Sequence, residues 1–325
     1  MVRIVVDQAG SPHGGAGRFR RELVDYTQRA HESLFQVIGL HTFLTPQWLA
    51  EREVRAAGAS QKIALNNASF VAPGGEKTVV LQNVIHFSNR AEQKSIGYSP
   101  SLRMRLQVPI IRAGALRADR IIVPTTEMLK RVSRALPSTQ NRIEVKALPL
   151  SPPAWIGTEP KEETVILLPQ TPQRYKPLAF HVQRLHDAIE LVGKDATIIC
   201  TCNPEELPKV ALLPRVTCIG RQTHEQMDAW YGRAQAVYFP TTYESFGYPV
   251  AEARAGGRWL LGQDTEQNRE IAGRALLGYD VTDIESLAEA VSQIGDPQPQ
   301  PEPEPFDPER FFNDVIFGNS NLQAH

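Results

Sequence analysis

The alternation of apolar strands with amphipathic helices is the feature that most restricts what this chain can fold into. The first element, VRIVVD, is typical of a buried strand, and the loop after it, DQAGSPHGGAGR, is rich in glycine. The segment FRRELVDYTQRA follows, with apolar or aromatic residues at helical spacing. A strand, a glycine-rich loop and a helix in this order predict an α/β fold.

The alternation continues in two series. In the first, the candidate strands are LFQVIGL, KTVVLQNV and DRIIVPT, and candidate helices run from Val108 to Arg117 and from Glu127 to Ala135. In the second, the candidate strands are TVILLP, ATIIC, RVTCIG, AVYFP and WLLG, and the candidate helices are KPLAFHVQRLHDAIELVG, HEQMDAWYGRA and IESLAEAVSQI. Strands that alternate with helices form parallel sheets, so each series predicts one Rossmann-like domain.

Proline-rich segments divide the chain into its predicted parts. The segment SPPAWIGTEPKEE, from Ser151, is typical of a linker. A second segment, DPQPQPEPEPF, can form neither a helix nor a central strand, and it predicts an extended, exposed connector. We therefore expect a first domain over residues 1–152, a second over 163–295, and a connector and tail over 296–325 whose aromatic residues dock on one of the domains.

Charge and hydropathy narrow the classes of partner and compartment. The formal net charge of -1 gives no electrostatic case for a nucleic acid or a membrane surface as partner. The basic residues of RFRREL and LRMRLQVPIIR lie at spacings that suit solvated helix faces. The N-terminus lacks the pattern of a secretion signal, and no apolar run approaches the length of a membrane span. We therefore expect a cytoplasmic protein without a transmembrane segment.

The cysteines Cys200, Cys202 and Cys218 are few and odd in number. Such a set argues against a disulfide framework and suits a reducing compartment. Cys200 and Cys202 are separated by one residue in a predicted strand, so their side chains share a face. This arrangement favours packing in the core over a metal site.

Two glutamates, Glu244 and Glu252, stand close together in YESFGYPVAEARAGG. Glu244 follows the predicted strand AVYFP, and Pro249 suits the first turn of a helix that would hold Glu252. Ligands of open parallel sheets bind at the carboxyl ends of strands, where carboxylates can accept hydrogen bonds from sugar and ribose hydroxyls. Backbone N–H groups around Phe246 and Gly247 can face an anion. Spacing alone equally fits a helix cap at Glu244 and a solvated acid at Glu252.

A longer stretch around these glutamates resembles a known family. The segment GRQTHEQMDAWYGRAQAVYFPTTYESFGYPVAEARAGG, continued through Glu270 and Gly273, closely resembles the retaining glycosyltransferases of family 4, which have the GT-B fold. The resemblance covers nearly all of the second domain and includes the family's E-x7-E motif as Glu244 to Glu252. The segment GGAGRFRREL resembles the family's GGxGR loop, whereas the middle of the first domain matches loosely. The resemblance implies two Rossmann-like domains whose parallel sheets face a central cleft.

The resemblance also implies a role for each matching residue of the second domain. The equivalent of Glu244 contacts hydroxyls of the transferred sugar on the reacting side of the donor. The backbone of Ser245, Phe246 and Gly247 lies against the sugar and the diphosphate. The equivalent of Glu252 binds the ribose hydroxyls of the nucleotide. With this pattern around them, we interpret both glutamates as donor ligands.

In the first domain, the resemblance implies that Gly14 and Gly15 bring backbone N–H groups close to the diphosphate. An ordinary turn would also explain both glycines. His13 is a further candidate beside them, and Arg18 is a candidate for stabilising the glycine loop.

The diphosphate site departs from the family's pattern. The family places an arginine shortly after the first strand of the second domain and a lysine a few residues further on, and both neutralise the diphosphate. Here Lys176 fits the lysine position, while Gln170 or Thr171 occupies the arginine position. Arg174 is a candidate substitute, and a solvated loop would also explain both basic residues. Because a leaving diphosphate needs positive charge to stabilise it, a chain in which neither residue reaches it would be a weak catalyst or none.

His86 is the remaining catalytic candidate. It closes the strand-like segment VVLQNVIHF, at a strand end where related enzymes often carry a polar group near the donor sugar. A structural histidine after an apolar strand is the alternative. Asn83 is a similar candidate.

The sequence therefore predicts a metal-independent, retaining, hexosyltransferase-like enzyme that uses a nucleotide-diphosphate-sugar donor and an acceptor hydroxyl. UDP is favoured over GDP because of its frequency in the family. The expected pathway is polysaccharide or natural-product biosynthesis, including antibiotics. No Asp-x-Asp motif stands in a plausible loop, so no metal or other cofactor is expected. The alternatives are a non-catalytic glycosyltransferase-like binding subunit and another GT-B enzyme, such as an epimerase or a phosphorylase.

Overall fold

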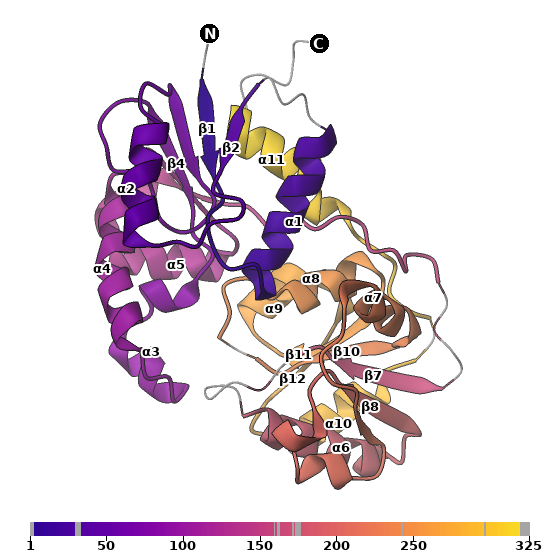
Figure 1. The fold of residues 1–325 in the computed structure, drawn as a ribbon. Coiled ribbons are helices and arrows are strands. Elements are labelled where there is room, and N and C mark those ends of the chain that lie inside the picture. Colours follow the sequence, from indigo (N-terminus) through magenta and orange to yellow (C-terminus); the bar gives the residue numbers. More distant parts are fainter. Residues whose placement is uncertain are drawn as a thin grey trace. The chain divides into compact units, whose positions relative to one another are not determined.

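Two parallel six-stranded sheets organise the chain. The computed structural model describes residues 3–29, 34–158, 160, 163–170, 172, 177–241, 243–295 and 297–318. The chain divides into two units, each with one sheet (Figure 1). The first unit comprises Met1–Lys94, Ser99–Ser151 and Phe306–His325, and the second comprises Ser95–Tyr98 and Pro152–Pro305.

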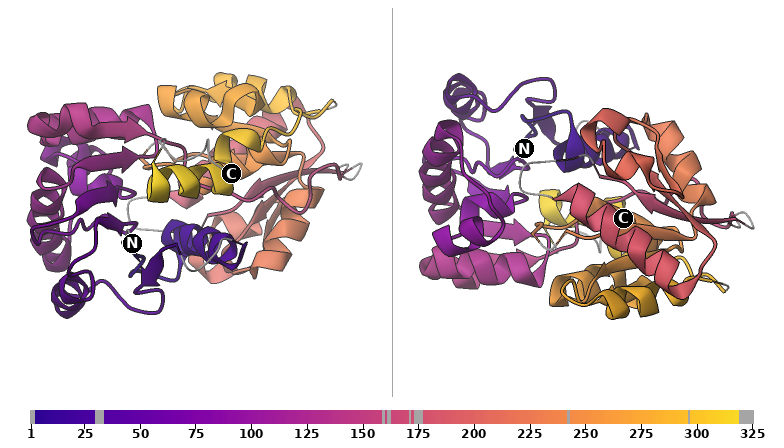
Figure 2. Two further views of the ribbon diagram at one scale, coloured as in Figure 1. Left: turned by 90° about the horizontal axis from the view of Figure 1, so that it is seen from above. Right: turned by 90° about the horizontal axis from the view of Figure 1, so that it is seen from below.

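The first unit is a Rossmann-like α/β layer structure. Its strands lie in the order β2 (Gln36–Ile38), β1 (Ile4–Asp7), β3 (Gln61–Ala64), β4 (Glu76–Val80), β5 (Arg120–Val123) and β6 (Ile143–Val145). Its helices are α1 (Gly14–Arg29), α2 (Pro46–Arg55), α3 (Arg90–Ser95), α4 (Leu102–Leu116), α5 (Thr126–Ala135) and α11 (Pro308–Phe317). Helices α1 and α11 cover one face of the sheet, and α2, α4 and α5 cover the other (Figures 1 and 2).

The second unit repeats this plan with a different strand order. Its strands lie in the order β12 (Leu276–Tyr279), β11 (Trp259–Gln263), β10 (Ala236–Phe239), β7 (Thr164–Leu168), β8 (Ala196–Cys200) and β9 (Val216–Cys218). Its helices are α6 (Leu178–Val192), α7 (His224–Arg233), α8 (Tyr248–Ala255), α9 (Glu266–Ala272) and α10 (Ile284–Ser292). Helices α6 and α10 pack on one face, and α7, α8 and α9 cover the other (Figure 1).

Burial explains why most residues of these strands are apolar. Every residue of β1 and β10 is buried, as expected for a parallel sheet covered by helices on both faces. Cys200 and Cys202 belong to the core that α6, α10 and the second sheet share, and Cys218 packs against it. The expected core packing of the cysteines is confirmed. Within the described parts of the chain, none of the helices has both the length and the apolar character needed to cross a membrane.

Helix α4 begins six residues before the helix expected from Val108. Ser101 caps it, because its hydroxyl accepts a hydrogen bond from the Met104 N–H at 3.3 Å. Pro109 lies inside the helix. The expected start at Val108 was therefore wrong, because the helix already begins at the cap formed by Ser101.

The proline-rich connector is extended but not fully exposed, which corrects the second part of its prediction. Arg254, from the E-x7-E segment, forms an ion pair with Glu302 at 2.8 Å, and its carbonyl accepts the Glu302 N–H at 3.1 Å. Gly257 leaves room for the connector, since a Cβ there would lie 2.7 Å from the Pro299 carbonyl oxygen. Residues 298, 299 and 301–303 are half-buried as a result.

The tail returns to the first unit and completes it. Phe311 and Phe312 of α11 pack edge-to-face on Phe19 of α1, with ring centroids 5.7 and 5.6 Å apart. Arg120, at the start of β5, donates a hydrogen bond to the Asp314 carboxylate at 2.8 Å. The expected docking of the tail aromatics is confirmed, and the first unit is where they dock.

Candidate active site

The E-x7-E segment lies at the carboxyl edge of the second sheet. Strand β10 ends at Phe239, and α8 begins at Tyr248. Glu244 is half-buried in the connection between them, and Glu252 is half-buried one turn into α8. Pro249 occupies the first turn of the helix, as predicted. The two carboxylates therefore frame the N-terminus of α8.

The backbone between the glutamates is held in one conformation. Gly247 is the N-cap of α8 and has a φ of 85°, which favours glycine. A Cβ at Gly247 would lie 3.3 Å from both the Phe239 ring and Val250. Phe246 is buried and contacts Tyr248 edge-to-face, with ring centroids 5.3 Å apart. The helix N-terminus thus has a fixed position relative to Glu244.

Glu252 has a specific partner that the sequence pattern did not identify. The Tyr231 hydroxyl, from α7, donates a hydrogen bond to Glu252 Oε2 at 2.6 Å. Trp155, from the predicted linker, stacks on the Tyr231 ring with centroids 4.7 Å apart and planes 5° apart. Gly256 leaves room for the indole, since a Cβ there would lie 2.1 Å from Trp155 Nε1. Arg258 Nε donates to the Tyr231 carbonyl at 3.1 Å. Tyr231 is therefore held by the stacked indole of Trp155 and by Arg258, and its hydroxyl orients the Glu252 carboxylate.

Gln170, one of the two residues predicted at the position of the family's arginine, is buried. It follows β7, is 7% exposed, and its Nε2 donates to Thr241 Oγ1 at 2.8 Å. This bond links the ends of β7 and β10, so Gln170 has a structural role at the sheet edge. Thr171, Arg174 and Lys176 lie outside the described residues.

The glycine loop of the first unit forms the N-terminus of α1. Gly14 is the first residue of the helix, has a φ of 63°, and is exposed together with Gly15. Gly17 is required by packing, because a Cβ there would lie 2.1 Å from the Pro12 carbonyl oxygen. The first turn contains no acidic residue. Its backbone N–H groups could therefore face an anion without a competing carboxylate.

Arg18 and His13 differ in their surroundings. Arg18 is buried and pairs with Glu22 one turn along α1, at 3.3 Å. Glu22 also accepts a hydrogen bond from the Ser151 N–H at 2.9 Å. Glu22 therefore connects α1 to the end of the stretch Ser99–Ser151 of the first unit. His13 is exposed, and its N–H donates to Ser11 Oγ at 3.2 Å.

His86 lies in a short 3-10 helix, η1 (Val84–Phe87), beyond the carboxyl end of β4. It is 5% exposed, and burial together with the nearby Arg112 charge lowers its pKa to about 4. The imidazole is therefore neutral near pH 7. Its Nδ1 is buried and has no hydrogen-bond partner among the described residues. Asn83 caps η1, because its Oδ1 accepts the Ile85 N–H at 3.0 Å.

A buried ion pair supports the end of β1, and the sequence analysis missed it. Asp7 is fully buried and accepts hydrogen bonds from Arg52 Nη1 at 2.7 Å, Trp48 Nε1 at 3.1 Å and Asn66 Nδ2 at 2.9 Å. Arg52 also donates to the Ala68 carbonyl at 2.7 Å. An acid that ends an apolar strand, as in VRIVVD, was the available signal. The network holds the backbone from which the glycine loop starts.

Comparison with known proteins identifies the family. Residues 173–296 match the model of the family described as glycosyl transferases group 1. Residues 173–296 of the chain are therefore a group 1 glycosyltransferase domain. The match includes Glu244, Glu252 and all of α7 and α8. The resemblance to family 4 found in the sequence is confirmed. The comparison with curated proteins gives no match.

Solved structures support the fold over the whole length of the chain. Sucrose-phosphate synthase from Thermosynechococcus elongatus is similar with a TM-score of 0.61 and 16% identity, over 100% of this chain and 96% of that one. HepE of Anabaena in complex with UDP has a TM-score of 0.61 and 14% identity, over 97% and 96%. MnaA of S. aureus with UDP has a TM-score of 0.55 and 11% identity, over 100% and 98%. The predicted GT-B fold class is confirmed.

In the part of the chain that the structure describes, no three His, Cys, Asp or Glu side chains gather as a metal site would require. The described candidates of the second unit are Glu244, the Ser245–Gly247 backbone and Glu252. Those of the first unit are Gly14, Gly15 and His86. Their roles toward a donor remain predictions.

Proposed function

We propose that this group 1 glycosyltransferase moves a hexose-like sugar from UDP to an acceptor hydroxyl with retention of configuration. The orientation of Glu252 supports the proposal most. The hydrogen bond from the Tyr231 hydroxyl to Glu252 Oε2, at 2.6 Å, helps to orient the carboxylate. Such a carboxylate suits the paired hydroxyls of a ribose, because two hydroxyl donors require two oriented acceptors.

Glu244 and the α8 N-terminus would act on the rest of the donor. Glu244 accepts hydrogen bonds from hydroxyls of the sugar. The N–H groups of Ser245, Phe246 and Gly247, with the positive end of the α8 dipole, face the diphosphate. Gly14 and Gly15 at the N-terminus of α1 are proposed to offer N–H groups of the same kind.

Departure of the diphosphate would produce an oxocarbenium-like transition state with negative charge developing on the leaving group. Oriented N–H groups stabilise this charge, and Lys176 and Arg174 are proposed to add positive charge. The acceptor hydroxyl attacks on the face that the diphosphate leaves. His86 would serve as a neutral hydrogen-bonding group, because its pKa of about 4 leaves it uncharged near neutral pH.

UDP is the proposed nucleotide because two structures of similar fold, HepE and MnaA, are described as complexes with UDP. HepE is also described in complex with UDP and glucose together. The acceptor is proposed to bind the first unit and to belong to polysaccharide or natural-product biosynthesis.

Calorimetric titration with UDP and with GDP, without added metal, tests the donor class. We expect micromolar affinity for UDP, weaker affinity for GDP, and loss of UDP binding in Glu252→Ala. Glu244→Ala should reduce the rate of sugar release from a UDP-sugar more than it reduces UDP affinity. Glu289→Ala, at an exposed position of α10, is the matched control. Unchanged UDP affinity in Glu252→Ala would remove that residue from the site.

A non-catalytic binding subunit is the second candidate, and Gln170 favours it. Gln170 or Thr171 is proposed to stand where the family has an arginine; both are neutral, and Gln170 is hydrogen-bonded to Thr241. Such a subunit would bind UDP but release no sugar from any UDP-sugar, with or without acceptors. Turnover that requires inorganic phosphate would indicate a phosphorylase, and conversion of the free UDP-sugar to its epimer would indicate an epimerase.

A further inference from the structure

Helix α4 has apolar residues on two opposite faces, and the first unit covers only one of them. Ile111, Gly114 and Ala115 are buried against the unit. Leu102 and Leu106 point away from it and are 74% and 62% exposed. An apolar face of a helix is normally buried against a neighbouring element.

The exposed residues form a continuous stripe. Leu102, Leu106 and Ile110 are spaced four residues apart, so they lie one above the other on the helix surface, and Ile110 is 51% exposed. Pro109 and Leu116 are exposed on the same side. We call Leu102, Leu106 and Ile110 the α4 stripe. Single exposed apolar residues are ordinary, whereas a contiguous set on one face indicates an interaction surface.

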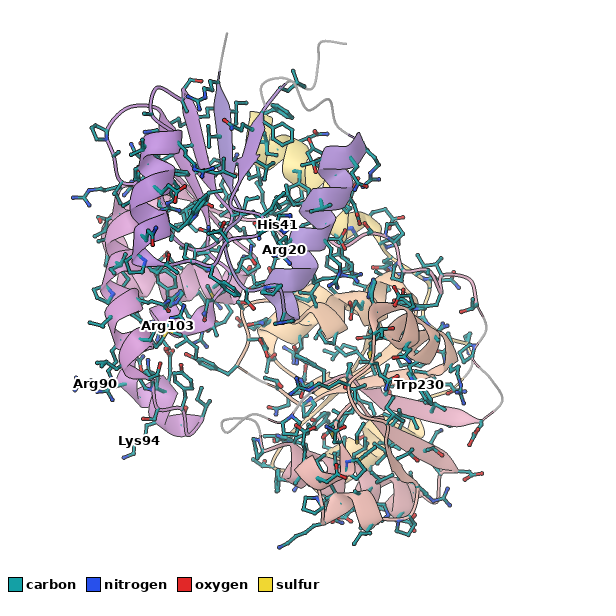
Figure 3. The ribbon with its side chains drawn as sticks, viewed as in Figure 1. Arg20, His41, Arg90, Lys94, Arg103 and Trp230 are labelled. Atoms are coloured by element: carbon teal, nitrogen blue, oxygen red, sulfur yellow. The ribbon has the colours of Figure 1, made fainter. Side chains whose placement is uncertain are left out.

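Basic residues border the stripe. Arg103 and Arg105 lie on its two sides along α4, and both are exposed. Arg90 and Lys94 of α3 are exposed as well, and with Arg103 they lie along one edge of the first unit (Figure 3). The sequence analysis interpreted the basic residues of α4 as a solvated helix face, and it did not consider the aliphatic residues between them.

The segment that carries these basic residues contains little negative charge of its own. From His86 to Arg117 the sequence contains a single acid, Glu92. Its carboxylate is already paired with Arg131 at 3.2 Å and with Arg134 at 3.1 Å. Residues 86–117 are therefore strongly basic, although the net charge of the whole chain is -1.

We propose that the α4 stripe docks on the surface of an anionic lipid bilayer. The three aliphatic side chains enter the boundary between headgroups and acyl chains, and Arg90, Lys94, Arg103 and Arg105 contact anionic headgroups. An aliphatic stripe bordered by exposed arginines is the pattern of a helix that lies in the plane of a membrane interface. The uniform sign of the charge favours an anionic lipid surface over a second copy of the chain, which would bring the same basic residues together.

Binding of the α4 stripe to a membrane surface would determine the location of the protein, and it does not depend on the proposed sugar transfer. Sedimentation of the full chain with vesicles tests it directly. We expect binding to vesicles that contain phosphatidylglycerol, little binding to pure phosphatidylcholine, and release at high salt, because salt screens the headgroup contacts.

Two variants separate the apolar and the basic contributions. Leu102→Ser/Leu106→Ser/Ile110→Ser and Arg103→Glu/Arg105→Glu should each weaken vesicle binding at least about tenfold. The matched controls are Leu212→Ser, at an 86% exposed leucine of the second unit, and Arg29→Glu/Arg310→Glu, at exposed arginines of α1 and α11. Both controls should bind as the unmodified chain does.

Because the substituted side chains are exposed, far-ultraviolet circular dichroism should be unchanged in every variant. Absence of binding to phosphatidylglycerol vesicles at low salt would overturn the proposal. It would also be overturned if the stripe variants bound as tightly as the controls. Analytical ultracentrifugation that shows a dimer converted to a monomer by the stripe variants would assign the stripe to a second copy of the chain instead.

Discussion

Replacement of Tyr231 by phenylalanine should weaken nucleotide binding because it removes the hydrogen bond that Tyr231 donates to Glu252. The ring of Tyr231 is 2% exposed and stacks on Trp155, and a phenylalanine ring can keep both the burial and the stacking. The substitution removes the hydroxyl that donates to Glu252 Oε2 at 2.6 Å. Glu252, which we propose binds ribose hydroxyls, then loses a hydrogen bond that orients its carboxylate.

The expected size of the effect follows from this hydrogen bond. A hydrogen bond to a charged group contributes about 1.5–3 kcal/mol. If the whole contribution serves to orient Glu252 for the nucleotide, the dissociation constant for UDP rises about 10- to 150-fold. The rate of the chemical step at saturating donor should change less, because Glu252 is proposed to bind the ribose and not the reacting carbon.

A double-mutant cycle with Glu252→Ala isolates the interaction. Calorimetry measures UDP affinity in the unmodified chain, both single variants and the double variant. Tyr231→Phe should have little further effect once Glu252 is alanine, because its target carboxylate is gone. Tyr26→Phe is a matched control, since the Tyr26 hydroxyl makes an equally short buried bond of 2.6 Å, to Asn313 in the first unit. It should leave UDP affinity unchanged.

Two results would refute the reasoning. Full UDP affinity in Tyr231→Phe would show that the hydroxyl does not orient Glu252 for the nucleotide. An equal loss in the presence and absence of the Glu252 carboxylate would show that the ring supports the site by another route.

Three further predictions concern stability and reactivity. Burial lowers the His86 pKa from 6.5 to about 4, so below pH 6.5 the unfolded chain binds a proton that the folded chain does not. Urea unfolding should therefore show that this histidine costs up to about 3 kcal/mol of stability between pH 7 and pH 4. The loss should be smaller in His86→Gln, whereas the control His41→Gln, at an exposed histidine, should lose as much as the unmodified chain. Arg52→Met leaves the Asp7 carboxylate buried without its charged partner. Chemical denaturation should show that the free energy of unfolding of the first unit falls by about 3–5 kcal/mol. A decrease of less than about 1 kcal/mol would contradict the proposed importance of this ion pair for stability. Burial and neighbouring thiols raise the Cys218 pKa to about 11, so a disulfide reagent at pH 8 should modify it slowly until the protein unfolds.

Much of the second unit could be predicted because its signals are local. The strand AVYFP, the glycine at position 247 and Pro249 stand within one short segment, and each constrains its neighbours directly. The same reasoning failed for β3, QKIA, where Lys62 is 2% exposed. A lysine inside a buried strand breaks the apolar pattern, and its ammonium group donates a hydrogen bond to the Pro73 carbonyl at 3.3 Å.

By itself, the sequence determined the α/β class, the family and the place of both glutamates next to the start of α8. Periodicity and short motifs depend on residues near one another in the chain, so they can be interpreted without coordinates. Only the tertiary structure decided that Tyr231 holds Glu252, that α11 returns to the first unit, and that the α4 stripe stays uncovered. Each of these depends on which distant segments meet, and packing between such segments is not encoded in any local pattern.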